Sequence, residues 1–158
     1  MTAPVRDPGA PVTLGGSLSL DLAYRIARGG CVPQLSPEAQ ARTKAAHARL
    51  AQALAERRHI YGLTTGFGPL ANRLVDPADG VLLQQNLVHH LASGVGPAYG
   101  WVEARAIVLA RLNSILQGVS GASTRSIAAL LALLGSELAP AIPCRGTVGA
   151  SGDLTPLA

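Results

Sequence analysis

The stretch from Ser36 to His59 restricts the fold of this chain more than any other. Ser36 can cap a helix with its hydroxyl, Pro37 suits the first helical position, and Glu38 places an acid in the first turn. The residues that follow are rich in alanine, arginine and leucine and include neither glycine nor proline, which favours a helix. The stretch ends in two arginines and a histidine at residues 57–59, which suit the negative end of the helix dipole. We therefore expect one long helix here.

Four further segments have apolar residues at helical spacing and are bounded by glycine or proline, which predicts four more helices. They are residues 18–28, 76–91, 101–117 and 123–138. Aromatic residues make up only 3% of the chain and alanine and leucine dominate, so helices packed through small aliphatic side chains are favoured over a β-sandwich. The predicted fold class is all-α. We expect a flexible N-terminal tail over residues 1–17, a helical domain over residues 18–158 and a linker at residues 33–37.

Charge and cysteine content argue against several classes of function. The net charge is +4, from 13 Lys and Arg against 9 Asp and Glu, and the basic residues are scattered, so no nucleic-acid partner is expected. Cys31 and Cys144 lie far apart without histidines at ligand spacing, so no metal site is expected, and two free thiols fit a reducing compartment. Residues 1–8 lack an apolar signal core, and the apolar run at 127–134 is too short to span a bilayer. We expect a cytoplasmic protein with no membrane partner.

Ala150, Ser151 and Gly152 form the tripeptide with the most unusual chemical potential. Glycines at 146, 149 and 152 let the backbone fold tightly on itself. Attack of the Gly152 nitrogen on the Ala150 carbonyl carbon would close a five-membered ring. Loss of two waters, one of them from the Ser151 hydroxyl, would leave an exocyclic methylene, which is an electrophile that ordinary side chains do not supply. By itself, however, Ala-Ser-Gly is far more often a simple turn.

Two other stretches carry candidate functional residues. Residues 60–70 contain three glycines and one proline and are predicted to form a loop, with Tyr61 at the junction between helix and loop. From spacing alone, Tyr61 is best explained as a packing residue. His89 and His90 are neighbours near the end of a predicted helix, and their side chains point about 100° apart, so they do not readily share one ligand. Either could be an ordinary surface histidine, and we keep that interpretation for His89.

Five stretches of the chain resemble the aromatic amino acid ammonia-lyase family, which includes histidine, phenylalanine and tyrosine lyases. They are Gly-Thr-Val-Gly-Ala-Ser-Gly-Asp-Leu-Thr-Pro-Leu-Ala at 146–158, Tyr-Gly-Leu-Thr-Thr-Gly-Phe-Gly at 61–68, Leu-Gln-Gln-Asn-Leu-Val-His-His-Leu-Ala-Ser-Gly-Val-Gly at 83–96, Arg-Leu-Asn-Ser-Ile at 111–115 and Gly-Val-Ser-Gly-Ala-Ser at 118–123. The resemblance runs over residues 18–158 and implies the N-terminal helical domain of the ammonia-lyase fold, with glycine-rich active-site loops. Members of the family continue into a long helical core. We expect that core to be absent here and the isolated chain to be inactive.

The resemblance also implies a cofactor and a base. Ala150, Ser151 and Gly152 would form 4-methylidene-imidazol-5-one (MIO) autocatalytically, without a metal. Tyr61 would be the catalytic base on a mobile inner loop, and Gly68 on the same loop would contribute to substrate binding. A phenol ordinarily titrates near pH 10, so a base of this kind needs nearby positive charge or donated hydrogen bonds.

Substrate choice is implied by the pair His90-Leu91. At this pair phenylalanine lyases have Phe-Leu, histidine lyases Ser-His and tyrosine lyases His-Leu. An imidazole can hydrogen-bond a phenol hydroxyl, and a pocket built to pair a hydroxyl rejects an analogue that lacks it. The chain therefore resembles the tyrosine-deaminating members most closely.

Three more residues keep alternative interpretations. Ser123 is a plausible helix cap within a scaffold segment. Asn113 is read as scaffold, with the alternative that it points into the site. Asp153 either orients the cyclising loop or caps a following helix.

The implied activity is the non-oxidative deamination of L-tyrosine to trans-4-coumarate and ammonia, within phenylpropanoid metabolism. The implied assembly is a homotetramer whose sites combine residues of several subunits. Alternatives are a phenylalanine or histidine lyase, a tyrosine 2,3-aminomutase, and an inactive helical fragment that acts, if at all, as an interaction module.

Overall fold

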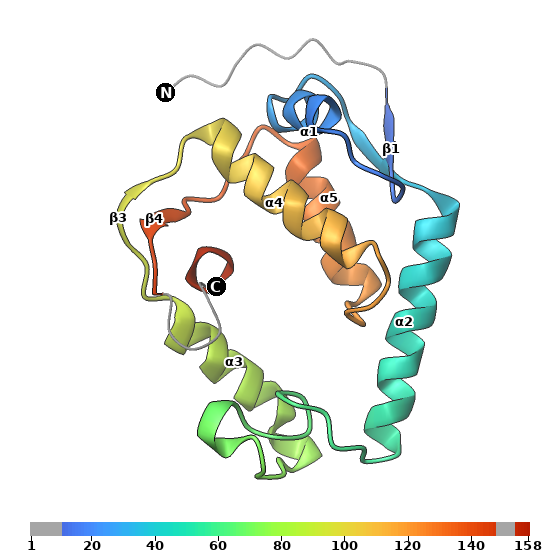
Figure 1. The fold of residues 1–158 in the computed structure, drawn as a ribbon, viewed down its shortest axis with the longest axis vertical. Coiled ribbons are helices and arrows are strands. Elements are labelled where there is room, and N and C mark those ends of the chain that lie inside the picture. The colour runs from blue at the N-terminus through green and yellow to red at the C-terminus, as the bar shows by residue number, and fades with distance from the viewer. Residues whose placement is uncertain (1–10, 148–153) are drawn as a thin grey trace. The chain divides into compact units, whose positions relative to one another are not determined.

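The computed structural model describes residues 11–147 and 154–158 of the chain, and it divides into two compact units. The first unit is Met1–Leu50 with Tyr99–Ala141, and the second is Ala51–Ala98 with Ile142–Ala158. As predicted, helices dominate the described residues (Figure 1): α1 (Leu20–Ala27), α2 (Pro37–Ala55), α3 (Gly80–Leu91), α4 (Trp101–Ile115) and α5 (Thr124–Gly135). The remaining elements are the strands β1 (Val12–Leu14), β2 (Pro33–Leu35), β3 (Val95–Ala98) and β4 (Pro143–Arg145), and the 3₁₀ turns η1 (Gly68–Leu70), η2 (Pro77–Asp79) and η3 (Thr155–Leu157).

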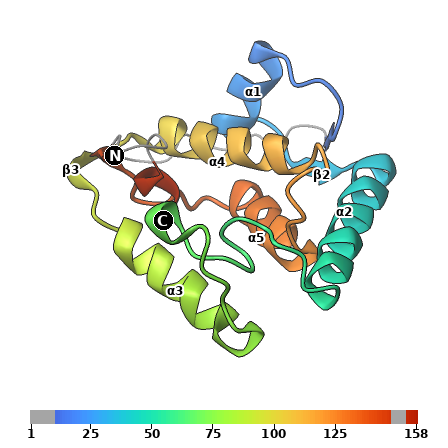
Figure 2. The same cartoon turned by 60° about the horizontal axis from the view of Figure 1, so that its bottom comes forward.

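The first unit has its core where α4 packs against α1 and α5 (Figure 2). The buried apolar side chains of this core are Leu14, Ile26, Cys31, Val108, Leu109, Leu112, Ile115, Leu116, Ile127 and Leu134. Helices α1 and α5 begin at serine caps: the Ser19 hydroxyl accepts a hydrogen bond from the Leu22 amide, and the Ser123 hydroxyl accepts one from the Ser126 amide. The predicted cap at Ser123 is therefore confirmed.

Arg105 on α4 is a buried cation that joins two helix ends in this core. Its side chain is 1% exposed and donates from Nε to the Ala27 carbonyl at the end of α1. Its Nη2 and Nη1 donate to the carbonyls of Leu134 and Ser136 at the end of α5, at 2.6 and 2.9 Å. The guanidinium also lies 4.5 Å from the centre of the Trp101 ring. A cation is favourable at helix C-termini because the last carbonyls there lack partners within the helix.

Helix α2 begins as predicted, with the Ser36 hydroxyl accepting from the Ala39 amide at 3.0 Å. It ends at Ala55, four positions before the expected end at His59. The reason is local: Arg57 adopts φ of 51°, and the Arg58 amide donates back to the Ala53 carbonyl. This is the left-handed helix ending that glycine usually provides, so the absence of glycine in the sequence hid it.

The structure differs from the sequence expectation at residues 12–14 and 33–35. These residues, assigned to a flexible tail and a linker, form strands β1 and β2, which pair in parallel with Val12 opposite Pro33 and Leu14 opposite Leu35. Leu14 is buried in the core. Strands of three residues are too short to show an alternating pattern, and their pairing depends on a partner distant in the sequence.

The second unit contains α3, the β3–β4 pair and the segment that follows α2. Strands β3 and β4 are antiparallel, with Val95 opposite Arg145 and Ala98 opposite Pro143. The predicted helix at 76–91 is present as the turn η2 followed by α3, and the Asp76 carboxylate accepts from the Ala78 amide at its start. Across residues 11–147 and 154–158, no helix combines the length and apolar character needed to cross a membrane.

Candidate active site

The loop that carries Tyr61 is held in shape by its own threonines. Thr64 Oγ1 donates to the Arg58 carbonyl at 2.6 Å and accepts from the Ile60 amide at 2.8 Å. Thr65 is buried, and its Oγ1 accepts from the Gly62 amide at 3.2 Å. Pairing of Thr65 with Leu74 closes the segment into a folded unit. The predicted loop is therefore an ordered structure with internal hydrogen bonds.

Gly62 is required by this loop for two reasons. Its φ is +70°, a left-handed conformation that favours glycine. A Cβ at this position would also lie 2.5 Å from Cε1 of Phe67. The Phe67 ring packs edge-on against the Tyr61 ring, with centroids 6.1 Å apart. Because Gly62 has no Cβ, the Phe67 ring has room to pack against the Tyr61 ring.

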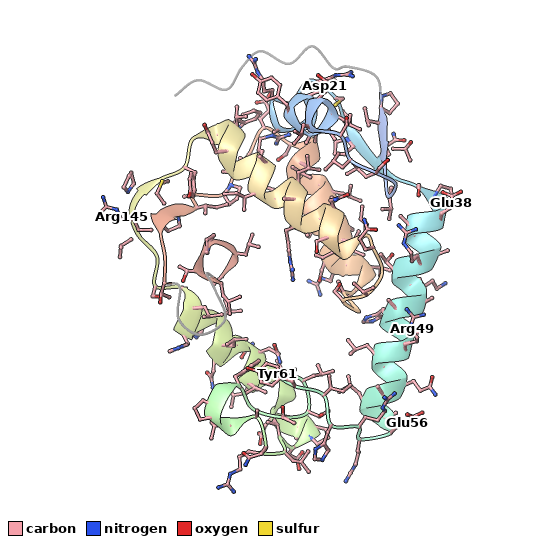
Figure 3. All side chains as sticks on the ribbon, in the orientation of Figure 1. Asp21, Glu38, Arg49, Glu56, Tyr61 and Arg145 are labelled. Atoms are coloured by element: carbon pink, nitrogen blue, oxygen red, sulfur yellow. The ribbon has the colours of Figure 1, made fainter. Side chains whose placement is uncertain are left out.

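Tyr61 and Gly68, both predicted site residues, are brought together by the loop. Tyr61 is 65% exposed, and its hydroxyl oxygen accepts a hydrogen bond from the Gly68 amide at 3.0 Å. A hydrogen bond donated to a phenolic oxygen stabilises negative charge on that oxygen. Figure 3 shows Tyr61 on the segment between α2 and α3. The Gly68 amide thus supplies one donated hydrogen bond of the kind that a tyrosine base needs.

The predicted ring-selecting residues lie at the C-terminal end of α3. His90 is exposed and Leu91 is half-buried. His89 is also exposed, in keeping with the surface role kept for it. Helix α3 is joined to the Tyr61 loop by Gln84, whose Nε2 donates to the Gly62 carbonyl at 2.8 Å. Sequence reasoning assigned no role to Gln84, although it lies in one of the stretches that resemble the lyase family.

Ala150, Ser151 and Gly152 lie outside the described residues, as does Asp153, but both flanks of this segment are described. A Cβ on Gly94 would lie 2.7 Å from Pro143 Cγ and 2.9 Å from Thr155 Cγ2. Pro143 precedes the tripeptide and Thr155 follows it, so residues on both sides of the tripeptide lie against Gly94. The two described flanks of the tripeptide therefore meet at Gly94, three residues beyond Leu91. Gly94 is a second position that sequence reasoning missed, because its packing partners are distant in the sequence.

A cavity of about 650 Å³ lies beside the Tyr61 loop. Its walls come from the end of α2, the loop itself and the start of α3, and include Leu54, Leu63, Leu74, Val81 and Gln84. The lining is mostly apolar and the size is typical of a small-molecule pocket.

Asn113 lies on α4 in the first unit, and its Oδ1 is buried without a hydrogen-bond partner among the described residues. Within residues 11–147 and 154–158, no three His, Cys, Asp or Glu side chains come together as a metal site.

Comparison with known proteins assigns the family. The sequence profile of the aromatic amino acid lyase family matches residues 18–158. Because that match includes nearly the whole chain, the protein belongs to the aromatic amino acid lyase family. Its described residues have the fold expected of the N-terminal helical domain of these enzymes.

Individual relatives fall within the same family. The chain is 60% identical over 151 residues to a tyrosine ammonia-lyase of Cereibacter sphaeroides, covering 96% of this chain and 29% of that protein. It is 40% identical over 144 residues to a histidine ammonia-lyase of Gloeobacter violaceus, covering 91% and 28%. Among solved structures, a tyrosine aminomutase from Streptomyces globisporus matches with a TM-score of 0.85 and 34% identity, over 92% of this chain and 27% of that one. The chain spans less than a third of the length of these relatives.

Proposed function

We propose that this chain forms part of a tyrosine ammonia-lyase, which converts L-tyrosine to trans-4-coumarate and ammonia. The observation that carries the proposal is the 60% identity to a tyrosine ammonia-lyase over nearly the whole chain. The histidine ammonia-lyase relative is only 40% identical. The presence of His90 and Leu91 at the ring-selecting positions supports the same choice of substrate.

The residues present fit the MIO group that the family implies. Ala150, Ser151 and Gly152 provide the three residues from which the ring is built. The contact of Gly94 with Pro143 and Thr155 holds the described flanks of that segment at one point, which supports the proposed ring closure. When formed, MIO supplies the electrophile that takes up the substrate amine and makes it a leaving group.

Tyr61 acts as the base in this proposal. Its oxygen, which accepts the Gly68 amide hydrogen bond, removes a proton from the β-carbon of the substrate. The electrons of that C–H bond form the new carbon–carbon double bond, the carbon–nitrogen bond breaks, and ammonia leaves. The proton on Tyr61 is then returned to solvent. Proton transfer by a positioned side chain contributes roughly 10²- to 10⁴-fold to such a rate.

The end of α3 would select the ring. The exposed His90 imidazole would hydrogen-bond the substrate phenol, and Leu91 would pack against the ring face. We further propose a homotetramer, a role in phenylpropanoid metabolism and a cytoplasmic location. The free thiols of Cys31 and Cys144 suit a reducing compartment.

A tyrosine 2,3-aminomutase is a second candidate, because solved tyrosine aminomutases share the fold at a TM-score of 0.85. Such an enzyme returns ammonia to the β-carbon, so its product is β-tyrosine instead of coumarate. A phenylalanine or histidine lyase would be expected to have residues other than His90 and Leu91 at the two ring-selecting positions. An inactive fragment is the remaining alternative for the isolated chain.

The proposal is tested by incubating the complete enzyme with L-tyrosine and separating the products. We expect trans-4-coumarate and ammonia in equal amounts, and loss of both in Ser151→Ala. Normal turnover by Ser151→Ala would refute the MIO assignment. A β-tyrosine product would favour the aminomutase, and turnover of phenylalanine or histidine alone would exclude a tyrosine-selective enzyme.

A further inference from the structure

Gln84 joins the loop that bears Tyr61 to the helix that bears His90 and Leu91. Its side-chain amide donates to the Gly62 carbonyl at 2.8 Å. Among the described residues, this is the only side-chain hydrogen bond from α3 to residues 60–70. Gly62 directly follows Tyr61, so Gln84 holds the backbone immediately beside the proposed base.

The other hydrogen bonds of this loop act within it. Thr64 bonds to Arg58 and Ile60, and Thr65 bonds to Gly62. These contacts fix the shape of the loop but not its position on α3. The placement of Tyr61 relative to α3 therefore depends on Gln84 more than on the threonines.

Gln84 also shares a helix face with one of the ring-selecting residues. Leu91 follows it by seven positions, which is about two helical turns and about 10 Å along the axis. Residues seven apart lie on the same side of a helix. The amide that holds the Tyr61 loop and the side chain that would pack against the substrate ring thus project from one face of α3.

We propose that Gln84 is a positioning residue, which sets the Tyr61 loop at a fixed place relative to the ring-selecting end of α3. This inference rests on the proposed lyase function. Gln84 does not touch the reacting atoms; it acts through Gly62 on Tyr61. The hydrogen-bond partner of the Gln84 amide is the Gly62 backbone carbonyl. The interaction therefore needs a side chain that is as long as glutamine and carries a hydrogen-bond donor.

The test uses Gln84→Met in the complete enzyme, which keeps the length of the side chain but removes the donor. Gln84→Glu is a second variant, because an ionised carboxylate cannot donate to the Gly62 carbonyl. The matched control is Gln85→Met, since Gln85 is exposed on the same helix and makes no side-chain hydrogen bond with the described residues. Hydrogen–deuterium exchange of residues 58–70 reports on the loop without any dependence on turnover.

Both Gln84 variants should raise loop exchange and lower kcat by about five-fold, the effect of losing one hydrogen bond. KM should stay near that of the parent, and the deuterium isotope effect with β-deuterated tyrosine should increase, because a displaced base slows proton removal. A role in folding alone would leave the isotope effect unchanged. Exchange and kcat in Gln84→Met equal to those in Gln85→Met would overturn the proposal. If the parent enzyme makes no coumarate but loop exchange still rises in both Gln84 variants, the lyase function fails while the hold of Gln84 on the loop stands.

Discussion

Gly94 packs directly against Pro143, so closely that a single methyl group at Gly94 would come within 2.7 Å of the proline ring. Thr155, which follows the tripeptide in the sequence, lies against the same glycine. Gly94→Ala should therefore force the flanks of Ala150–Gly152 apart, destabilising the protein by about 1–3 kcal/mol. We also expect a loss of MIO ultraviolet absorbance, because ring closure requires a closely held segment. Denaturant unfolding and the absorbance spectrum measure the two effects.

Gly80→Ala is the matched control for this substitution. A Cβ on Gly80 would meet no packing neighbour within 4 Å, and Gly80 begins α3 in a helical conformation. Alanine there should be neutral or stabilising by about 0.5 kcal/mol. Equal behaviour of the two variants would contradict the packing role of Gly94.

Tyr61→Phe removes the oxygen that accepts the Gly68 amide hydrogen bond and that would act as the base. We expect kcat to fall by roughly 10²- to 10⁴-fold. Stability should change little, since Tyr61 is 65% exposed. Tyr24→Phe provides the comparison, because Tyr24 is also an exposed tyrosine with one hydrogen bond, from Arg28. A Tyr61→Phe enzyme as active as Tyr24→Phe would rule out the base assignment.

His90→Phe should shift the substrate preference from tyrosine toward phenylalanine. A phenyl side chain cannot hydrogen-bond the substrate hydroxyl, so the variant would lack the hydrogen bond that the proposal assigns to His90 and tyrosine. The ratio of kcat/KM for the two amino acids measures the change, which we expect to be at least about ten-fold. His89→Phe, at the neighbouring exposed position, should leave the ratio near its original value. An unchanged ratio in His90→Phe would mean that another residue selects the ring.

Arg105→Leu should destabilise the first unit strongly. It would remove the donor to the carbonyls of the buried residues Ala27 and Leu134, and also to the Ser136 carbonyl. One unpaired buried polar group costs about 1–3 kcal/mol. We expect a total loss of at least about 3 kcal/mol in the free energy of unfolding, measured by urea titration. Arg111→Leu, an exposed site on the same helix, should change stability by no more than about 0.5 kcal/mol. Similar losses for the two variants would show that Arg105 is not specifically required.

Cys31 makes stability depend on pH in the alkaline range. Burial raises the pKa of its thiol above the ordinary value of 9.0, while the nearby Arg25 charge lowers it to a smaller extent. The folded protein therefore holds this proton more tightly than the unfolded chain. Its contribution is fully present below about pH 9 and is lost as the pH rises through the raised pKa. Unfolding free energies measured from pH 7 to 10 should show this decline, and Cys31→Ala should lessen it.

Cys144→Ser serves as the control for the pH series, because Cys144 is exposed. It should retain the alkaline decline that Cys31 causes. A thiol reagent at neutral pH should modify Cys144 in the folded protein and reach Cys31 only after unfolding. Rapid modification of Cys31 in the folded state would contradict its burial.

The sequence predicted the helices well because helix signals are local. Serine caps at Ser19, Ser36 and Ser123 and glycine after α1 act within a few residues of the helix ends. The candidate site residues could not be predicted from local signals in the same way. Tyr61, Gly68, His90 and Leu91 came from resemblance to a family. From spacing alone, Tyr61 was best explained as a packing residue and His90 could be an ordinary surface histidine.

Tertiary structure decided the features that depend on partners far along the chain. Strands β1 and β2 exist because Val12–Leu14 meets Pro33–Leu35, and Arg105 is buried because two helix ends converge on it. Likewise, the contacts of Gln84 with Gly62 and of Gly94 with Pro143 join segments whose local sequences contain no sign of each other. The sequence alone determined where helices form and which residues could do chemistry. Only the fold determined which backbone groups hold those residues, because hydrogen bonding and close packing act between neighbours in space.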